Sequence, residues 1–274
     1  MLVSEQATMG ITLYQNHAEQ LLKDYVLADS FIPCTSIIGG IFASKVVYDL
    51  TQTISAIYFK SYASLSKMQR VEWNNRAIST LHAIFITTIS LYFVFWSDLF
   101  SDQFAGLITL RCSQLSTFAL GVSVGYFLAD LGMILWFYPA LGGFEYVIHH
   151  LLSIAAVAYA MLTGEGQLYT YMVLISETTT PGINLRWYLD ATGKRRSRAY
   201  VINGVVIFFA WLVARIILFM YLFYHFYLHY DQVQQLRSFG LFLVSVVPLV
   251  LTVMNLMWFA KIVKGLKKTI AKTQ

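Results

Sequence analysis

Charged residues are scarce in this sequence. They make up 12% of its 274 residues, whereas 58% are hydrophobic and the mean hydropathy is +0.62. An ordinary soluble domain carries about 25% charged residues, so a water-soluble fold is not expected. The net charge of +5 does not indicate nucleic-acid binding, because the basic residues flank apolar runs, where a membrane surface accounts for them.

Cysteine is also rare. Cys34 and Cys112 lie far apart and beside apolar stretches, which excludes a disulfide framework and a CxxC zinc site. The first residues contain neither the basic segment nor the apolar segment of a cleavable signal peptide, so we expect the first span to target the chain. No linker rich in proline, glycine or serine divides the sequence, which predicts one membrane domain between short tails.

Long hydrophobic runs dominate what is present. A membrane-spanning helix needs roughly 20 mostly apolar residues at about 1.5 Å of rise each. The sequence therefore predicts an all-α polytopic membrane protein of about seven transmembrane helices, of which the fifth is the least apolar and is interrupted by Pro181-Gly182. The predicted spans are residues 31–59, 77–97, 114–138, 145–163, 167–189, 199–225 and 239–262.

Basic residues gather in three patches, which seven spans place on one side of the membrane. Because cytosolic loops carry an excess of lysine and arginine, this bias predicts a cytosolic C-terminus and a non-cytosolic N-terminus. The predicted organisation is a non-cytosolic tail at 1–30, a first helix and loop at 31–64, a six-helix domain at 65–265 and a basic cytosolic tail at 266–274. The patches are Lys60, Lys67, Arg70 and Arg76; Lys194, Arg195, Arg196 and Arg198; and Lys261, Lys264, Lys267, Lys268 and Lys272.

Ionisable residues at membrane depth are candidates for function. Each costs on the order of 2.5–3.5 kcal/mol on insertion scales, so it usually faces the bundle interior and has a partner. Lys45 and Asp49 are four residues apart, which favours mutual neutralisation on one helical face. Arg215 can pair with Glu177 or Asp130 and lock two helices together, and a functional role for it stays equally open.

The adjacent pair His149-His150 is the sharpest local feature. An unperturbed imidazole titrates near neutrality and can take and return a proton. Neighbouring helical residues point about 100° apart, so we expect one histidine to meet a substrate and the other to bond a neighbouring helix or to position its partner. The pair cannot easily chelate one ion; a metal site would need His82, Asp130 and Glu177 as well, and none is predicted.

Several polar groups are expected at a similar depth. We count about 1.5 Å per residue from the predicted cytosolic end of each span. The count predicts a polar cavity that opens toward the cytosol and suits an acyl-CoA or a lipid head group from that leaflet, with His82 a little deeper and Glu177 near the midplane. Gly121 and Gly125 form a GxxxG pair, which close helix packing explains. The residues of the cytosolic half are His149, His150, Asp130, Arg186, Asn203 and Asn255.

The order of these residues resembles a known family. Over roughly residues 65–265 it is similar to the TLC domain family, the TRAM, LAG and CLN homology proteins, and within it to the branch called TLC domain-containing protein 4. The motifs that carry the resemblance are Trp73-Asn74-Asn75-Arg76, Ser79, His82-Ala83, Gly125-Tyr126-Phe127, Asp130, His149-His150, Glu177, Thr180-Pro181, Asn184, Arg186-Trp187, Val201-Ile202-Asn203-Gly204 and Met254-Asn255.

The resemblance implies a membrane-embedded helical barrel around a lipid-accommodating cavity, in the endoplasmic reticulum or another endomembrane. Among the relatives, ceramide synthases acylate a sphingoid base from acyl-CoA with a His-His pair, which His149 and His150 match by position. Their next helix carries a His-Asp and a further Asp, whereas this chain has Ser176-Glu177-Thr178-Thr179-Thr180-Pro181. The departure argues against ceramide synthesis itself, but Glu177 can still orient a histidine, so other acyl transfer stays open.

Two functions fit these residues. The first is a role in lipid metabolism or membrane-lipid homeostasis, in which a lipid or acyl chain binds in an intramembrane cavity. The second is an acyltransferase with acyl-CoA as co-substrate, in which one histidine takes a proton or an acyl group while Asp130 or Glu177 fixes its tautomer. A transporter would need a second broken span to match Pro181-Gly182, which the sequence lacks.

The candidate site residues divide by role. No bound cofactor is expected, the expected partners are membrane lipids, and a homo-oligomer stays open. Arg76 and Arg186, near the cytosolic face, are candidates for holding a phosphate or CoA. The catalytic candidates are His149, His150, Asp130 and Glu177, and the candidates for holding a lipid head group are Arg76, His82, Asn184, Arg186, Asn203 and Asn255.

Overall fold

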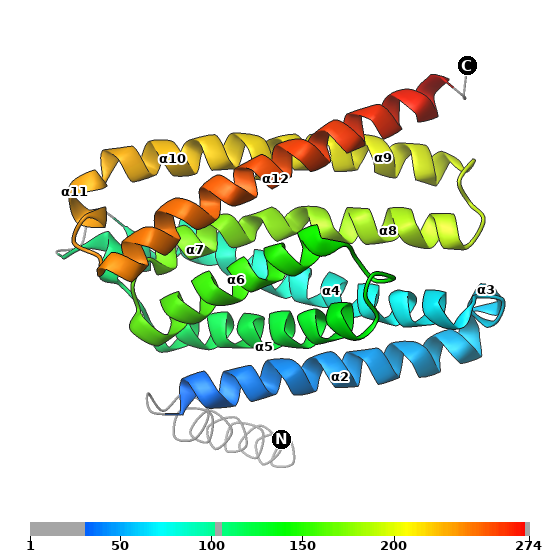
Figure 1. Ribbon diagram of the computed structural model, residues 1–274, viewed down its shortest axis with the longest axis horizontal. Coiled ribbons are helices and arrows are strands. Elements are labelled where there is room, and N and C mark those ends of the chain that lie inside the picture. The colour runs from blue at the N-terminus through cyan, green and yellow to red at the C-terminus, as the bar shows by residue number, and fades with distance from the viewer. Residues whose placement is uncertain (1–30, 102–105, 272–274) are drawn as a thin grey trace, which may run out of the picture.

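The computed structural model describes residues 31–101 and 106–271, and within these ranges its regular elements are all helices. Figure 1 shows long helices that run roughly side by side along one axis. The all-α prediction is confirmed. The predicted tail at 1–30 and the last residues of the predicted tail at 266–274 lie outside the described residues.

Within the described residues, seven helical rods occupy the seven predicted spans. Five of them are long and apolar enough to cross a membrane, and the first and the fifth are not among these five. The rods are α2 (Ile32–Tyr58); α4 (Lys67–Leu91) with η2 (Tyr92–Trp96); α5 (Gln114–Trp136); α6 (Phe144–Thr163); α7 (Gln167–Leu174), η5 (Ile175–Thr179) and α8 (Thr180–Ala191); α9 (Arg198–Trp211), η6 (Leu212–Ile217) and α10 (Leu218–Leu228); and α12 (Ser238–Ala271). Short helices connect them: α3 (Lys60–Ala63), η3 (Asp98–Phe100), η4 (Ile108–Leu110) and α11 (Tyr230–Val233).

Two rods extend beyond the predicted spans by more than two turns. The second rod begins at Lys67 rather than at residue 77, because Ser66 and Gln69 form a capping box with bonds of 3.2 and 2.9 Å between side chains and backbone N–H groups. Such a box stabilises a helix start whatever the hydropathy of the turns that follow. The last rod continues past residue 262 to Ala271. Hydropathy therefore located the membrane part of these helices but not their ends.

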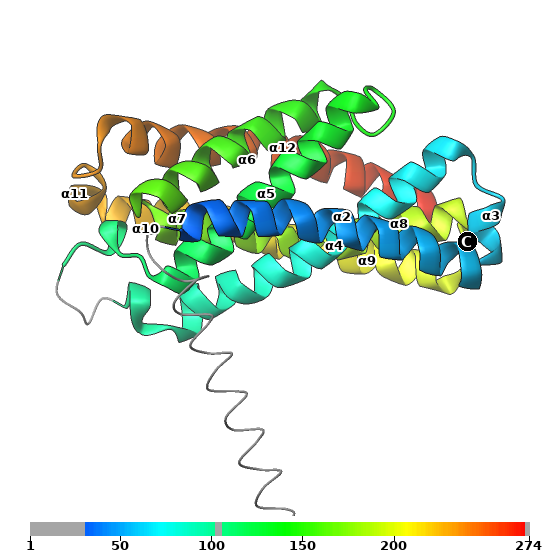
Figure 2. The same cartoon turned by 90° about the horizontal axis from the view of Figure 1, so that it is seen from below.

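The first rod packs against α5 through glycines. A Cβ atom on Gly40 would lie 2.3 Å from the carbonyl oxygen of Val122, and one on Gly125 would lie 2.2 Å from that of Ile37. Gly121 is equally close to α2, so both glycines of the GxxxG pair meet this helix. Only residues without a side chain let two helices approach so closely. Figure 2 shows α2 running along α5 and α4.

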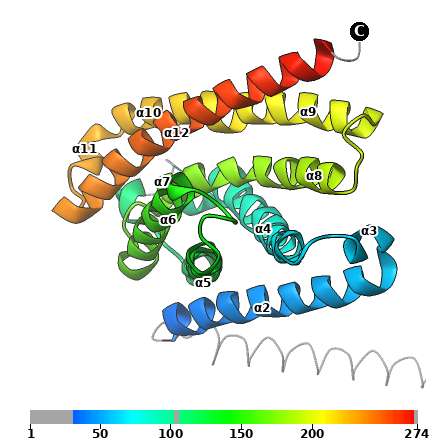
Figure 3. The same cartoon turned by 45° about the vertical axis from the view of Figure 1, so that its right-hand side comes forward.

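The bundle buries polar groups within a largely apolar core, and apolar groups also cover its outside. Figure 3 shows α2 at one edge and α9, α10 and α12 at the other, with the remaining rods between them. Large apolar side chains such as Trp136 and Met220 face outward, as expected for a surface in contact with lipid. Lys45 and Asp49 form the predicted ion pair on the exposed side of α2.

The described residues of the three basic patches lie at one end of the bundle, which we call the basic end. In Figure 1, α3, the connection from α8 to α9 and the C-terminal part of α12 all lie at the right. The connection between α5 and α6 lies nearer to this end than the turn from α6 to α7 does, and that turn lies at the opposite end. This arrangement gives the bundle two chemically different ends.

Candidate functional site

A cavity of about 470 Å³ lies among α4, α5, α6, α8, η6 and α12. It reaches toward the basic end, because the connection at 139–142 and Lys261 belong to its wall. All four catalytic candidates line it, together with two of the six head-group candidates, Arg76 and Asn184. Its polar and ionisable lining residues are Glu72, Asn75, Arg76, Ser79, Tyr126, Asp130, Tyr146, His149, His150, Glu177, Thr180, Asn184, Arg215 and Lys261.

His150 is held by bonds at both ring nitrogens. Its Nε2 atom lies 2.7 Å from Oδ2 of Asp130, and its Nδ1 atom lies 2.8 Å from the carbonyl oxygen of Tyr146. Asp130 also accepts bonds from Asn75 Nδ2 at 2.7 Å and from the Tyr126 hydroxyl at 3.4 Å. The imidazole is therefore fixed in orientation, and neither of its nitrogens is available to a ligand.

His149, in contrast to His150, is not held by hydrogen bonds at both ring nitrogens. Its Nδ1 atom is buried and has no hydrogen-bond partner among the described residues. Its ring meets that of Trp258 edge to face, with centroids 5.9 Å apart, and meets that of His150 at 5.4 Å. Of the two histidines, His149 is thus the one whose polar atoms are not taken up by the protein.

Glu177 and Arg215 form a second polar unit on the cavity wall. The two side chains are buried, and Arg215 Nη2 lies 3.7 Å from Oε1 of Glu177. Arg215 also donates from Nε to the Thr179 hydroxyl at 2.9 Å and from Nη1 to Asn255 Oδ1 at 3.1 Å. Glu177 accepts a bond from the Thr180 hydroxyl at 2.7 Å. Of the two partners expected for Arg215, the structure selects Glu177.

The backbone around this unit departs from the α-helix on both sides. Glu177 lies in the 3-10 segment η5 and Arg215 in the π-helical segment η6. A π-helical turn widens the helix and often marks a functional position. Pro181 follows η5 and has no backbone N–H to donate, so it interrupts the helical hydrogen bonds of the fifth rod. Glu177 faces the cavity at this interruption.

Arg76 and Asn184 form a third unit near the basic end. Arg76 donates to Glu72 Oε1 from Nε at 3.0 Å and from Nη2 at 2.6 Å, and from Nη1 to Asn184 Oδ1 at 2.9 Å. Its guanidinium also lies over the Trp187 ring, 4.9 Å from the centroid. Asn184 returns bonds to α4, including one to the Arg76 carbonyl at 3.0 Å. All three nitrogens of this guanidinium are thus engaged, and Asn184 joins α8 to α4.

His82 lies behind the cavity wall. Its ring stacks on that of Tyr126 with centroids 3.8 Å apart and meets Phe127 edge to face at 5.4 Å. Both of its ring nitrogens are buried without a partner among the described residues. His82 therefore packs against the cavity side chains but does not line the cavity.

The remaining head-group candidates also lie outside the main cavity. Arg186 lies over the Tyr200 ring at 4.0 Å, and Asn203 donates to the Gly182 carbonyl at 2.9 Å, so both connect α8 to α9. Asn255 holds Arg215 instead, and it lines a smaller hollow of about 20 Å³ next to the cavity.

A row of hollows leads away from the main cavity. The small hollow shares Phe127, His149, Glu177 and Arg215 with the main cavity. It also shares Ser153, Val173, Leu174 and Leu251 with an apolar crevice of about 50 Å³. His149 and Ser153, one helical turn apart on α6, thus stand where polar and apolar spaces meet.

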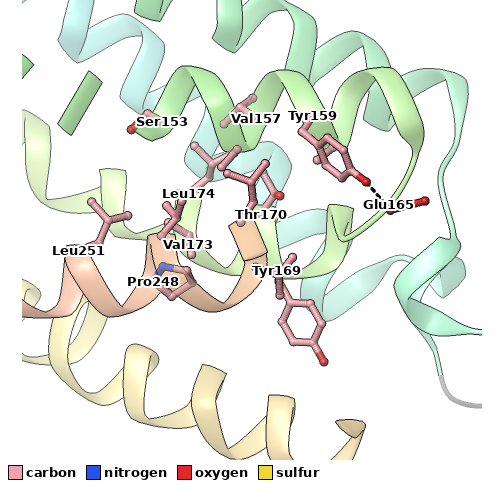
Figure 4. A pocket seen from close by; sticks show the side chains of 15 residues that line it. Ser153, Val157, Tyr159, Glu165, Tyr169, Thr170, Val173, Leu174, Pro248 and Leu251 are labelled. Atoms are coloured by element: carbon pink, nitrogen blue, oxygen red, sulfur yellow. Dashed lines mark hydrogen bonds between the residues drawn. The ribbon is translucent and has the colours of Figure 1, made fainter. Parts of the chain in front are cut away.

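Figure 4 shows the apolar crevice between α6, α7 and α12. Ten of the fifteen residues that line it have hydrocarbon side chains, and its end farther from Ser153 carries the hydrogen bond of 2.6 Å from Tyr159 to Glu165. Arg237 pairs with Glu165 from outside at 3.0 Å. The labelled side chains are Ser153, Val157, Tyr159, Glu165, Tyr169, Thr170, Val173, Leu174, Pro248 and Leu251.

Sequence reasoning missed several lining residues. Tyr126 and Glu72 each precede a candidate, Asp130 and Arg76, by four residues, and this helical spacing was a signal that could have found them. Trp258 and Lys261 had no such signal, because only the packing of α12 brings them to the cavity. Among the described residues, no group of three or more His, Cys, Asp or Glu side chains is placed to hold a metal ion.

Comparison with known proteins identifies a family that this chain matches. The family model described as the TLC domain matches residues 72–264. TLC domain-containing protein 4-B of Xenopus laevis is 28% identical over 223 residues, which cover 76% of this chain and 79% of the relative. TLC domain-containing protein 4 of Homo sapiens is 28% identical over 228 residues, covering 82% and 85%. TLC domain-containing protein 4 A of Dictyostelium discoideum is 24% identical over 223 residues, covering 81% and 84%.

Proposed function

This chain belongs to the TLC domain family, and from that premise we propose that it binds a membrane lipid inside the bundle and acts in lipid metabolism or membrane-lipid homeostasis. The head group occupies the polar cavity, and a hydrocarbon chain passes His149 into the apolar crevice. Asp130, His150, Glu177 and Arg215 shape the polar part, whereas Arg76 and Asn184 line it nearer the basic end.

The observation that carries this proposal is the change in chemistry along one row of hollows. The main cavity of about 470 Å³ has ionic and amide groups on its wall, and the crevice of about 50 Å³ is lined mostly by hydrocarbon. Small-molecule sites are typically cavities of about 300–1,000 Å³ with a few placed polar groups. A polar space and an apolar space that adjoin in this order through shared lining residues suit a molecule with one polar and one apolar end.

The basic end gives the site a direction. Cytosolic loops of membrane proteins carry the excess of lysine and arginine, so we place this end, and with it the C-terminus, in the cytosol. The cavity then takes its ligand from the cytosolic leaflet. As the family resemblance implies, we place the protein in the endoplasmic reticulum or another endomembrane.

Substitution of Ser153 tests the proposal, because this residue lines both the small hollow and the crevice. Ser153→Phe places a ring between head-group and chain spaces, whereas Ser153→Ala removes only the bond to the His149 carbonyl at 2.8 Å. We expect wild type and Ser153→Ala to retain lipid through purification, and Ser153→Phe to lose most of it, as measured by native mass spectrometry at matched unfolding temperature. Equal retention in the two variants would contradict the proposal.

Acyl transfer is a second candidate, favoured by the buried and unpartnered Nδ1 atom of His149. A ring nitrogen of His149 attacks the carbonyl carbon of an acyl thioester such as acyl-CoA, the C–S bond breaks, and the thiol leaves with the ring proton. An amine or hydroxyl of the second substrate then attacks the acyl imidazole and gives its proton back to the imidazole. This sequence returns the histidine unchanged.

Genetic rescue separates the two candidates. Cells that lack the protein are complemented with wild type, His149→Ala or Ser153→Phe at equal expression, and their lipids are quantified. Under the lipid-binding proposal, His149→Ala restores the lipid profile and Ser153→Phe does not. If both variants fail and one lipid class disappears while His149→Ala still binds lipid, acyl transfer replaces binding as the function.

A further inference from the structure

The ionic side chains of the main cavity neutralise one another in pairs. Glu72 holds Arg76 through two hydrogen bonds, and Glu177 faces Arg215 at 3.7 Å. Glu72 and Arg76 are half-buried, whereas Glu177 and Arg215 are buried, and buried charges persist in proteins only when each has a partner. The cavity wall nevertheless contains three acidic side chains and three side chains of lysine or arginine besides its two histidines. The net charge of the cavity wall therefore depends on Asp130 and on the one cationic side chain outside these two pairs.

A proton count settles the state of the Asp130 and His150 pair. The Tyr146 carbonyl can only accept a bond, so His150 Nδ1 must carry a proton. The 2.7 Å contact between Nε2 and the Asp130 carboxyl also needs a proton between its two atoms. Whether that proton belongs to the imidazole or to the carboxyl, the pair as a whole is neutral. Asp130 is consequently not available to compensate another cation.

Lys261 is the cation that remains. Its side chain is exposed where it lines the cavity, and no carboxylate among the described residues lies within ion-pair distance of its ammonium group. It follows Trp258 on α12 by three residues, or roughly 4.5 Å along the helix axis. Because the Trp258 ring contacts that of His149, Lys261 stands about one turn above the histidine toward the basic end.

We propose that the lipid taken up by the main cavity carries a net negative charge on its polar end, and that Lys261 contacts that charge. The inference rests on the proposed lipid binding and adds the class of ligand. A phosphate or other anionic group at Lys261 neutralises the last charge of the wall, and the adjoining carbons pass Trp258 and His149 toward the crevice. A zwitterionic head group brings a second charge for which the wall has no unpaired carboxylate among its described residues.

Lipid retention from a defined mixture tests this inference. Full-length protein is reconstituted with equal amounts of phosphatidylglycerol and phosphatidylcholine of identical chains, repurified in detergent and analysed by mass spectrometry. The variants are Lys261→Ala, Lys261→Glu and Lys261→Arg, and the matched control is Lys264→Glu, which changes the same charge on the same helix without lining the cavity. Ser153→Phe reports how much of the retained lipid occupies the cavity.

We expect the wild type to retain phosphatidylglycerol over phosphatidylcholine by about fivefold, the ratio expected from one partly exposed ion pair. Lys261→Ala and Lys261→Glu lose this preference, whereas Lys261→Arg and Lys264→Glu keep it. Addition of palmitoyl-CoA separates two sources of the anionic group: displacement of the phospholipid points to a CoA ester, and no displacement points to the phospholipid head group.

Three results would overturn the inference. If the lipid in the cavity shows no preference for an anionic head group, the inference is wrong. The proposed lipid binding then still holds, because retention depends on Ser153. An equal loss of preference in Lys261→Glu and Lys264→Glu shows that the general surface charge, rather than the cavity, selects the lipid. Absence of any lipid sensitive to Ser153→Phe removes both the inference and the proposed function.

Discussion

His150 and Asp130 are joined across α6 and α5 by a contact of 2.7 Å between Nε2 and Oδ2, and both side chains are buried, at 6% and 8% exposure. His149, one position earlier, has no partner at Nδ1 among the described residues. The two histidines thus have different surroundings although they are adjacent in sequence. Substitutions at the two positions should therefore have different consequences for stability.

Asp130→Ala should destabilise the protein more than His149→Ala does. Asp130→Ala removes the hydrogen-bond partner of His150, Asn75 and Tyr126, and a buried polar group left without a partner costs about 1–3 kcal/mol. For His149→Ala we expect about 1 kcal/mol, the centre of the distribution for single substitutions. Thermal unfolding of purified protein in one detergent measures both changes.

Asp130→Asn is the matched variant for this comparison. Its amide nitrogen can donate a bond to Nε2 of a neutral His150, whose one N–H remains on the Tyr146 carbonyl, so we expect about 1–2 kcal/mol of destabilisation from the lost charge. If His149→Ala lowers the unfolding temperature as much as Asp130→Ala does, the assignment of His150 as the structural histidine is wrong.

Glu177 and Arg215 should show coupling in a double-mutant cycle. Arg215→Met leaves Glu177 buried without its cation, and Glu177→Leu leaves Arg215 buried without its carboxylate. The double variant removes both charges, so we expect a coupling free energy of about 1–3 kcal/mol in the direction that makes it less harmful than the sum of the single changes. Additive losses within about 0.5 kcal/mol would show that the pair, at 3.7 Å, contributes nothing as a pair.

Hydropathy predicted the positions of all seven rods, although five of them are long and apolar enough by themselves for a bilayer, which demands about 20 apolar residues per crossing. The start of α4 at Lys67 was missed, since the turns from Lys67 to Arg76 are polar and are specified by the cap at Ser66. GxxxG predicted close packing of the third span. It did not identify α2 as the partner, because a glycine pair indicates a flat helix surface but not which helix packs against that surface.

The sequence predicted the depth of the site residues in the membrane but not the direction in which their side chains point. Counting residues from the span ends placed Asp130, His150 and Asn203 at similar depth, and all three are buried. Only the first two line the cavity, because Asn203 turns to the Gly182 carbonyl between α8 and α9. Depth follows from a rise of about 1.5 Å per residue, whereas rotation about the helix axis depends on contacts that the sequence does not display. The roles proposed for these residues stay predictions.

Gly125→Ala should separate α2 from α5. A methyl group there meets the carbonyl oxygen of Ile37 at 2.2 Å, a contact that only movement of a helix can relieve. We expect a loss of about 1–3 kcal/mol, as for overpacked cores. The matched control is Gly132→Ala on the same helix, where a Cβ meets nothing within 4 Å and where alanine favours the helix by up to about 1 kcal/mol.

Unfolding temperature and protease sensitivity of the α2–α3 connection report this change. Gly125→Ala should unfold at a lower temperature and be cut faster, and Gly132→Ala should match or exceed the wild type in both. Equal behaviour of the two variants would mean that α2 does not pack against α5 as described.

Ala156→Phe should shorten the hydrocarbon chain that the protein retains. Ala156 lines the apolar crevice, so an added ring occupies space that the proposed chain enters. In a bilayer the competing environment is also hydrocarbon, and discrimination must come from steric exclusion rather than from the hydrophobic effect. Overpacking by about 1–3 kcal/mol corresponds to at least about a fivefold change in the ratio of long to short chains.

Leu151→Phe is the control, because Leu151 lies on the same helix with 53% of its surface exposed toward the outside. Phosphatidylglycerols with chains of different length, offered together and quantified after repurification, give the ratio for each variant. A shift toward short chains in Ala156→Phe alone locates the hydrocarbon in the crevice. If neither variant shifts the ratio while Ser153→Phe still abolishes retention, the chain leaves the cavity by another route, and the crevice is a packing defect between α6 and α12 rather than part of the binding site.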